Sequence, residues 1–247
     1  MASLTDAFEF PLTRGMTALL DLEELAAGLA QARSSHDPRW CHLMAARLGE
    51  RLPTLGPDDL TQTLLPEAQH WIRFLEDLAE RPGADGGKVA RMRGALHSLS
   101  ERLAADWPEY FRSLQRDPWL VPYLAPTDEG GPRPCPRTWA ALEEESRGQR
   151  LAAWEDQLEP LGTLAEAVLR LTRDSLQWQE MAIPPEGTAL DLPASPATGL
   201  VRILPPQEGQ VPAFSGVGPA STIRILAATE LDSLPDPVQV TLGWFTL

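Results

Sequence analysis

Lysine is almost absent from this sequence of 247 residues: Lys88 is the only lysine among 21 basic residues, against 35 acidic ones. The formal net charge of −14 argues against non-specific binding to nucleic acid and to anionic membrane surfaces, because both need a basic surface. No hydrophobic run approaches the length of about 18 residues that a membrane-spanning helix needs. We therefore expect no nucleic-acid partner and no membrane partner.

Cysteine and histidine are also scarce. Cys41 and Cys135 form no CxxC pair, which favours free thiols in a reducing compartment. Residues 1–12 include Asp6 and Glu9 and lack the pattern of a signal peptide, so we expect a cytoplasmic protein. The histidines form no HExxH motif and no zinc-ligand spacing with cysteine, so we expect no metal and no cofactor. They are His36, His42, His70 and His97.

Motifs for catalysis are missing as well. The segment Ser215-Gly216-Val217-Gly218 is not a GxGxxG, GKS or GxSxG motif and is better explained as a β-hairpin turn. The carboxylates of residues 143–145 are consecutive, so on a helix they do not face one another and form a solvated face. Nothing assembles a nucleophile, a base and an oxyanion hole. We predict that the protein is not an enzyme and has no small-molecule substrate.

A long amphipathic stretch is the main positive feature. Between residues 150 and 178, apolar residues recur mostly every three or four positions, which predicts one face of a helix over residues 147–179. Pro160 is expected to kink this helix or to divide it. The apolar positions are Leu151, Trp154, Leu158, Leu161, Leu164, Val168, Leu171 and Trp178.

Shorter helices are predicted on both sides of a proline-rich segment at residues 107–136. In that segment we expect one short helix around residues 110–114, and Trp119 is open to two interpretations, a core residue or an exposed anchor. Pro66 is expected to interrupt the third helix near its start. The other helices are predicted at about 14–33, 38–52, 58–81, 88–103 and 138–145.

The C-terminal part favours strands. Period-two alternation and β-branched residues predict strands at residues 200–204, 221–226 and 238–245, and residues 1–12 are expected to be an extended lead-in. The predicted fold is therefore α+β, with a mainly helical domain (a helical bundle) at residues 1–182 followed by a small antiparallel β domain at residues 183–247. Such a small β domain should pack on the helices or on a second copy of the chain.

The order of several short motifs resembles the ZapD family, whose members bind and cross-link the bacterial division protein FtsZ. Each motif is weak alone, but together they span the chain in the family's order. The matching segments are Phe8-Glu9-Phe10-Pro11-Leu12 with Met16 and Leu19; Gly130-Gly131 with Pro136 and Leu142; Leu158-Glu159-Pro160-Leu161; Leu200-Val201-Arg202; and Pro212, Ser215 and Gly216 with Ile223-Arg224-Ile225.

The resemblance implies a homodimer without cofactor or catalysis that binds the C-terminal tail of FtsZ and bundles protofilaments at midcell, so stabilising the Z-ring. It also implies partner-binding roles for Arg202 and Arg224, with Arg116 close to a family arginine. A strand would place Arg224 on the face opposite Ile223 and Ile225, where a guanidinium can meet a carboxylate; a solvated arginine is the alternative for Arg202 and Arg224.

The chain departs from the family at several basic positions. Where the family usually has basic or histidine residues, this sequence has Asp21, Pro118, Trp139, Gly218 and Ala220. We therefore expect binding of the FtsZ tail to depend more on apolar contact and less on charge than in the family. Two alternatives remain: a dimeric adaptor of the same fold with another protein partner, and an uncharacterised enzyme.

Overall fold

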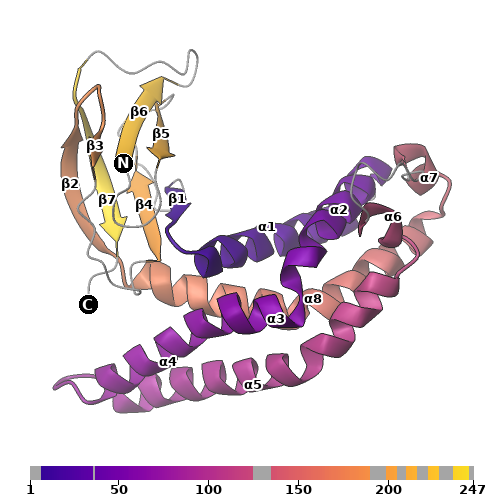
Figure 1. Ribbon diagram of the computed structural model, residues 1–247, viewed down its shortest axis with the longest axis horizontal. Coiled ribbons are helices and arrows are strands. Elements are labelled where there is room, and N and C mark those ends of the chain that lie inside the picture. Colours follow the sequence, from indigo (N-terminus) through magenta and orange to yellow (C-terminus); the bar gives the residue numbers. More distant parts are fainter. Residues whose placement is uncertain are drawn as a thin grey trace. The chain divides into compact units, whose positions relative to one another are not determined.

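The computed structural model describes residues 7–35, 37–124, 135–189, 199–204, 210–215, 222–227 and 236–244 (Figure 1). The chain divides into two compact units. The helical unit is Ala18–Leu169, and the β unit joins Met1–Thr17 to Arg170–Leu247. The predicted α+β class is confirmed, because a mainly helical part is followed by antiparallel strands.

Helix α2 (Pro38–Arg51) begins close to its predicted start, after a capping aspartate. The Asp37 carboxylate accepts a hydrogen bond of 2.8 Å from the Arg39 amide, and Pro38 occupies the first turn. Pro66 lies in the first turn of α4 (Leu65–Ala79), where a π-helical turn at Leu60–Leu64 gives way to α-helix. The remaining elements of this part are the long helix α1 (Arg14–Ser35) and two short ones, a 3-10 turn (Leu52–Leu55) and α3 (Pro57–Asp59).

Helix α5 (Gly86–Arg116) corrects the prediction of a separate short helix around residues 110–114. It continues through Pro108, although proline removes a backbone donor. Trp107, Phe111 and Leu114 are buried on its stripe, and this burial on both sides of the proline favours continuing the helix. Helices α4 and α5 lie side by side (Figure 1). After α5 come α6 (Val121–Leu124) and α7 (Pro136–Ala140).

The long amphipathic stretch forms α8 (Glu144–Asp174), which is continuous through a buried Pro160. The predicted end at residue 179 is wrong: the helix stops at Asp174, and Gln177–Ile183 forms strand β2. Trp178 therefore belongs to a sheet, although its spacing fits the helical stripe. None of the described helices is both long enough and apolar enough to cross a lipid bilayer.

The β unit contains a four-stranded sheet in the order β1-β4-β7-β2 and a three-stranded sheet in the order β3-β6-β5, with antiparallel pairing throughout. The predicted strands correspond to β4 (Leu200–Leu204), β6 (Thr222–Ala227) and β7 (Val238–Trp244). The prediction missed β2, β3 (Thr188–Ala189) and β5 (Gln210–Ser215), and the extended lead-in contains β1 (Phe8–Pro11).

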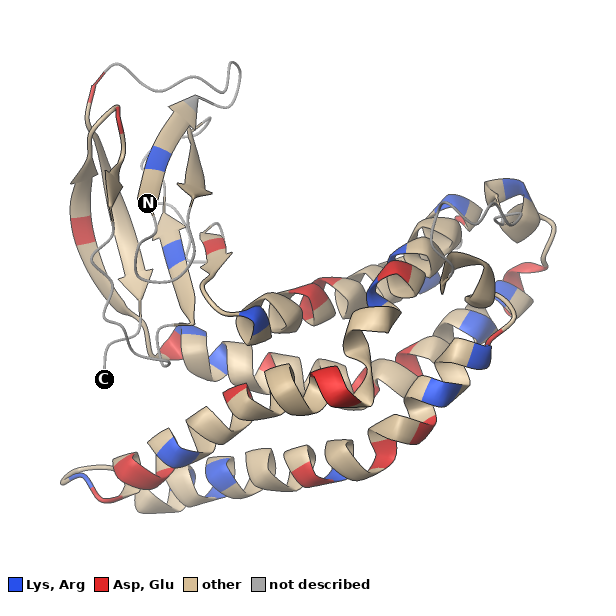
Figure 2. Cartoon of the chain, in the orientation of Figure 1, with Lys and Arg blue, Asp and Glu red and all other residues tan. Residues whose placement is uncertain are grey.

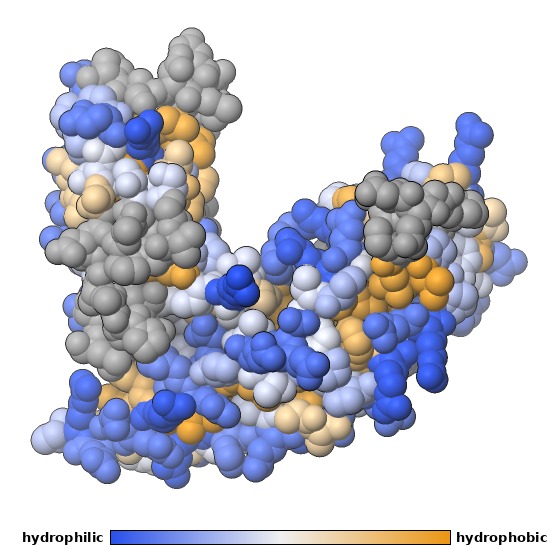
Figure 3. Space-filling view, in the orientation of Figure 1, coloured by the Kyte–Doolittle hydropathy of each residue, from blue (hydrophilic) through white to orange (hydrophobic). Residues whose placement is uncertain are grey.

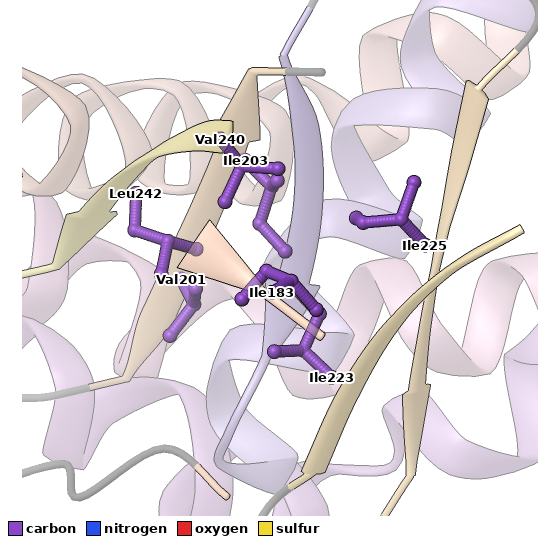
Figure 4. Close-up of a cluster of buried hydrophobic side chains, with 7 residues drawn as sticks. All are labelled: Ile183, Val201, Ile203, Ile223, Ile225, Val240 and Leu242. Carbon is purple, nitrogen blue, oxygen red and sulfur yellow. The ribbon is translucent and has the colours of Figure 1, made fainter. Parts of the chain in front are cut away.

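The inner faces of the two sheets share one apolar core, shown in Figure 4. Alternate residues of β4, β6 and β7 point into it, as the period of two along a strand requires. Phe10, Leu12, Met181, Phe214, Val238 and Trp244 pack around its margin. The fully enclosed members are Ile183, Val201, Ile203, Ile223, Ile225, Val240 and Leu242.

Candidate functional site

The outer face of the three-stranded sheet carries Arg224. Its neighbours along β6, Ile223 and Ile225, are buried, whereas Arg224 is exposed, so the predicted orientation of these three side chains is confirmed. Arg224 lies opposite Ala213 in the register, and the next pair on the same face is Val211 with Leu226. The surface thus offers one guanidinium beside small and aliphatic side chains.

A tight turn limits the movement of Arg224. The amide of Gly187 donates to the carbonyl of Pro184 over 2.8 Å, and Gly187 has a φ of +88°. A Cβ atom at Gly187 would lie 2.5 Å from Cγ of Arg224 and 2.7 Å from the carbonyl oxygen of Ile223. Glycine is therefore needed both for the backbone conformation and for the space. The turn packs against the stem of Arg224 and leaves its charged end at the surface.

Arg202 occupies a different environment on the outer face of the four-stranded sheet. Its Nε atom lies 2.8 Å from Oε1 of Glu9, its register partner on β1, and its side chain is 12% exposed. Arg173, from the last turn of α8, meets the same carboxylate through Nε (2.8 Å) and Nη2 (2.6 Å). The structure thus gives Arg202 an acidic partner within the chain. For Arg224, no ion pair to a carboxylate of the described residues is present.

Sequence reasoning missed Glu9 and Arg173. A usable signal was present, because the alternation in Phe8-Glu9-Phe10 places Glu9 on the face opposite two aromatic residues. A single carboxylate on an otherwise apolar strand indicates a basic neighbour when the strand is paired. The register between residues 8–11 and 200–203 was not available from local pattern, so the pairing of Glu9 with Arg202 could not be derived.

Arg116 lies in the helical unit, in the last turn of α5. It lines a shallow hollow together with Glu109, Arg112, Ser113 and Asp117. Asp117 is engaged elsewhere, because it accepts a hydrogen bond of 3.0 Å from the indole of Trp154 and pairs with Arg150 at 3.4 Å. Of the three predicted arginines, Arg202 and Arg224 thus belong to the β unit, on separate sheets, and Arg116 belongs to the helical unit.

A tryptophan cluster includes Trp139, one of the positions where the family resemblance leads one to expect basic residues. Trp139 is fully buried, and its ring centroid lies 4.8 Å from that of Trp119 and 5.9 Å from that of Trp154. The guanidinium of Arg150 lies over Trp119 at 5.1 Å. Trp119 is therefore part of a packed cluster and is not an exposed anchor. Pro118, the second such position, is exposed beside the cluster.

Asp21, a third such position, has an internal partner. Arg51 approaches both oxygens of its carboxylate, at 3.0 Å and 2.9 Å. Burial raises the pKa of the Asp21 carboxyl, and the charge of Arg51 opposes this shift. Gly218 and Ala220 lie outside the described residues. Asp21 and Trp139 therefore both contact other side chains of the helical unit.

Charged and apolar residues are distributed differently over the helices and the strands. Figure 2 shows basic and acidic residues interspersed along the helices, whereas Arg202 and Arg224 are the basic residues of the described strands. Figure 3 shows apolar surface on the helical unit near α6, where Val121 is 48% exposed, and Leu43 of α2 is 43% exposed. Within the described ranges, no group of three or more His, Cys, Asp or Glu side chains is placed to hold a metal ion.

Comparison with known proteins connects these features to one family. No family model matches the chain. The cell division protein ZapD of Chromobacterium violaceum is 28% identical over 174 residues, which cover 68% of this chain and 69% of that protein. The match extends over much more than any single motif of the sequence, and it agrees with the family that the ordered motifs indicate. This similarity supports the chain as a divergent member of the ZapD family.

Proposed function

We propose that this protein is a cell-division factor that binds the C-terminal tail of FtsZ and cross-links its protofilaments, without catalysis. The 174-residue match to ZapD of Chromobacterium violaceum carries the proposal, and the order of the motifs from Phe8 to Arg224 supports it. In this proposal the protein acts in the cytoplasm at midcell. It works as a homodimer, because two equal sites on one dimer can bridge two filaments without a strong single contact.

Arg224 is the residue that we propose as the main contact to the tail. It is exposed, its stem is held by the turn at Gly187, and aliphatic side chains lie on the same face. A guanidinium at such a place can donate two parallel hydrogen bonds to a carboxylate of the peptide, while the aliphatic residues contact apolar groups of the same peptide. The resemblance that points to Arg224 also points to Arg202 and Arg116. Arg116 remains a proposed contact, whereas Arg202 already has Glu9 as a partner within the chain.

The first test is cosedimentation with FtsZ from the same organism, using the wild-type chain and Arg224→Glu. We expect the wild type to co-pellet with FtsZ filaments and not with FtsZ that lacks its tail. Arg224→Glu should weaken binding by about tenfold or more, since a charge-assisted hydrogen bond contributes about 1.5–3 kcal/mol. Arg81→Glu, at an exposed turn of the helical unit, makes the same charge change and should bind normally.

Sedimentation equilibrium of Arg224→Glu should give the same oligomeric state as the wild type. Unchanged FtsZ binding by this variant would remove Arg224 from the site. A wild-type chain that never co-pellets with FtsZ would favour the alternative of an adaptor with another partner. The internal roles of Asp21 and Trp139 support that alternative, because two positions expected to be basic serve the fold instead.

The salt dependence of binding tests the expected balance between charge and apolar contact. With few basic residues at the proposed site, we expect the dissociation constant for an FtsZ-tail peptide to rise by less than about threefold between about 50 and 300 mM salt. Fluorescence anisotropy of a labelled tail peptide measures this directly. A steep loss of affinity over the same range would show that charge dominates, contrary to the expectation.

A further inference from the structure

Strand β1 carries an unusually well-paired carboxylate. Glu9 is 16% exposed and faces Arg173 through both of its oxygens and Arg202 through one. The pair with Arg173 is forked, which restricts the relative orientation of the two groups as well as their distance. Because the three side chains are mostly buried, solvent screens this cluster less than it screens a surface ion pair. Glu9 thus fixes β1 to β4 and to the end of α8.

The cluster continues across the sheet. Glu9, Arg202, Gly243 and Trp178 are register partners on β1, β4, β7 and β2. A Cβ atom at Gly243 would lie 2.9 Å from Cε3 of Trp178, so the indole lies directly over the glycine. The guanidinium of Arg202 lies 6.0 Å from the centroid of the same indole, within reach of a cation–π contact. Arg202 is therefore held from two sides by groups of its own chain.

The next residue of β1 contacts the other sheet. Phe10 points to the opposite face from Glu9 and stacks on Phe214 of β5, with ring centroids 4.9 Å apart and planes 20° apart. Phe214 is the register partner of Ile223, and its neighbour Ala213 is the partner of Arg224. Strand β1, at the edge of the four-stranded sheet, thus contacts its neighbour β4 through Glu9 and the strand pair that carries Arg224 through Phe10.

We propose that Glu9 and Phe10 are positioning residues that fasten the two sheets together, and that Arg202 influences partner binding through Glu9 without touching the partner. This inference rests on the proposed function for its binding readout, but its structural part does not. Loss of the Glu9 charge should loosen β1, and Phe10 would then no longer hold Phe214. The strand pair β5–β6 would then no longer be held in one position relative to β4.

Hydrogen exchange on the free protein tests the structural part. In Glu9→Gln, which keeps the size of the side chain, we expect amides of β1, β5 and β6 to exchange about tenfold faster, while α4 and α5 are unchanged, because local opening follows the contacts that are lost. Phe10→Ala should do the same, and Phe10→Tyr, which keeps the ring, should restore protection. Glu180→Gln, at an exposed position of β2, is the control for loss of one carboxylate. Unchanged exchange in β5 and β6 would overturn the inference.

A double-mutant cycle tests the role of Arg202. We expect Glu9→Gln and Arg202→Gln each to weaken binding of the FtsZ-tail peptide by about three- to tenfold, and the double variant to be no weaker than the worse single variant. If Arg202 touches the partner itself, the two effects will multiply, and that outcome overturns the positioning role. Failure of the wild type to bind FtsZ bears on the proposed function alone, since hydrogen exchange needs no partner.

Discussion

Replacing Gly49 by alanine is expected to destabilise the helical unit by about 2–3 kcal/mol, the upper part of the usual range for overpacking a core. A Cβ atom at Gly49 would lie 2.3 Å from Cβ of Tyr123 and 3.2–3.3 Å from the backbone of Tyr123. A side-chain rotation cannot relieve this contact, because backbone atoms take part in it. Helix α6 would have to move away from α2.

That movement has a second consequence. The Tyr123 hydroxyl and Nδ1 of His42 are 2.8 Å apart and hydrogen-bonded across the same two helices, and separating the helices weakens the bond. Denaturant unfolding followed by circular dichroism measures the total effect. The matched control is Gly94→Ala in α5, where a Cβ atom meets nothing within 4 Å and the better helix propensity of alanine should stabilise by about 1 kcal/mol. Equal stabilisation by both substitutions would show that α6 does not restrict Gly49.

Trp107→Ala is expected to have the largest effect, a loss of about 3–5 kcal/mol. The side chain is fully buried in the helical unit, and its indole nitrogen donates a hydrogen bond of 2.7 Å to the carbonyl oxygen of Leu55. Truncation leaves a large cavity and removes the donor from a buried carbonyl at the end of the 3-10 turn. Both the cavity and the lost hydrogen bond lower the free energy of unfolding.

Trp107→Phe separates the two contributions. Phenylalanine retains most of the apolar volume but has no donor, so we expect a loss of about 1–2 kcal/mol, mainly from the unpaired carbonyl of Leu55. Chemical unfolding of both variants, read at the same temperature, gives the difference that belongs to the cavity. A phenylalanine variant as unstable as the alanine variant would contradict this division, because the hydrogen bond would then dominate.

Local pattern was sufficient for much of the fold. Asp37 and Pro38 specify the start of α2, and β-branched alternation specifies β4, β6 and β7, because capping and burial of one strand face are decided by neighbouring residues. The same alternation predicted that Arg224 points away from Ile223 and Ile225. Local pattern failed at Trp178, whose spacing fits a helix although the residue lies in a strand. It also failed at Pro108, where burial of Trp107 and Phe111 outweighs the cost of the proline.

The candidate site was only partly accessible in this way. The sequence order of the motifs indicated the ZapD family, and strand period indicated the face of Arg224. The partners of Arg202 were not accessible, because Glu9 and Arg173 are 164 residues apart and meet only when β1 pairs with β4. Asp21 and Trp139 likewise acquire their internal partners only when separate helices pack together.

By itself, the sequence determined the α+β class, most helices, three strands, the resemblance to the ZapD family and the outward direction of Arg224, since each follows from local propensity, short-range periodicity or collinear motifs. Only the tertiary structure decided that the N-terminal strand belongs with the C-terminal sheets, that Glu9 holds Arg202, and that Phe10 reaches the strand pair of Arg224. The physical reason is that strand pairing and ion pairing join residues irrespective of their separation along the chain, so no local pattern specifies them.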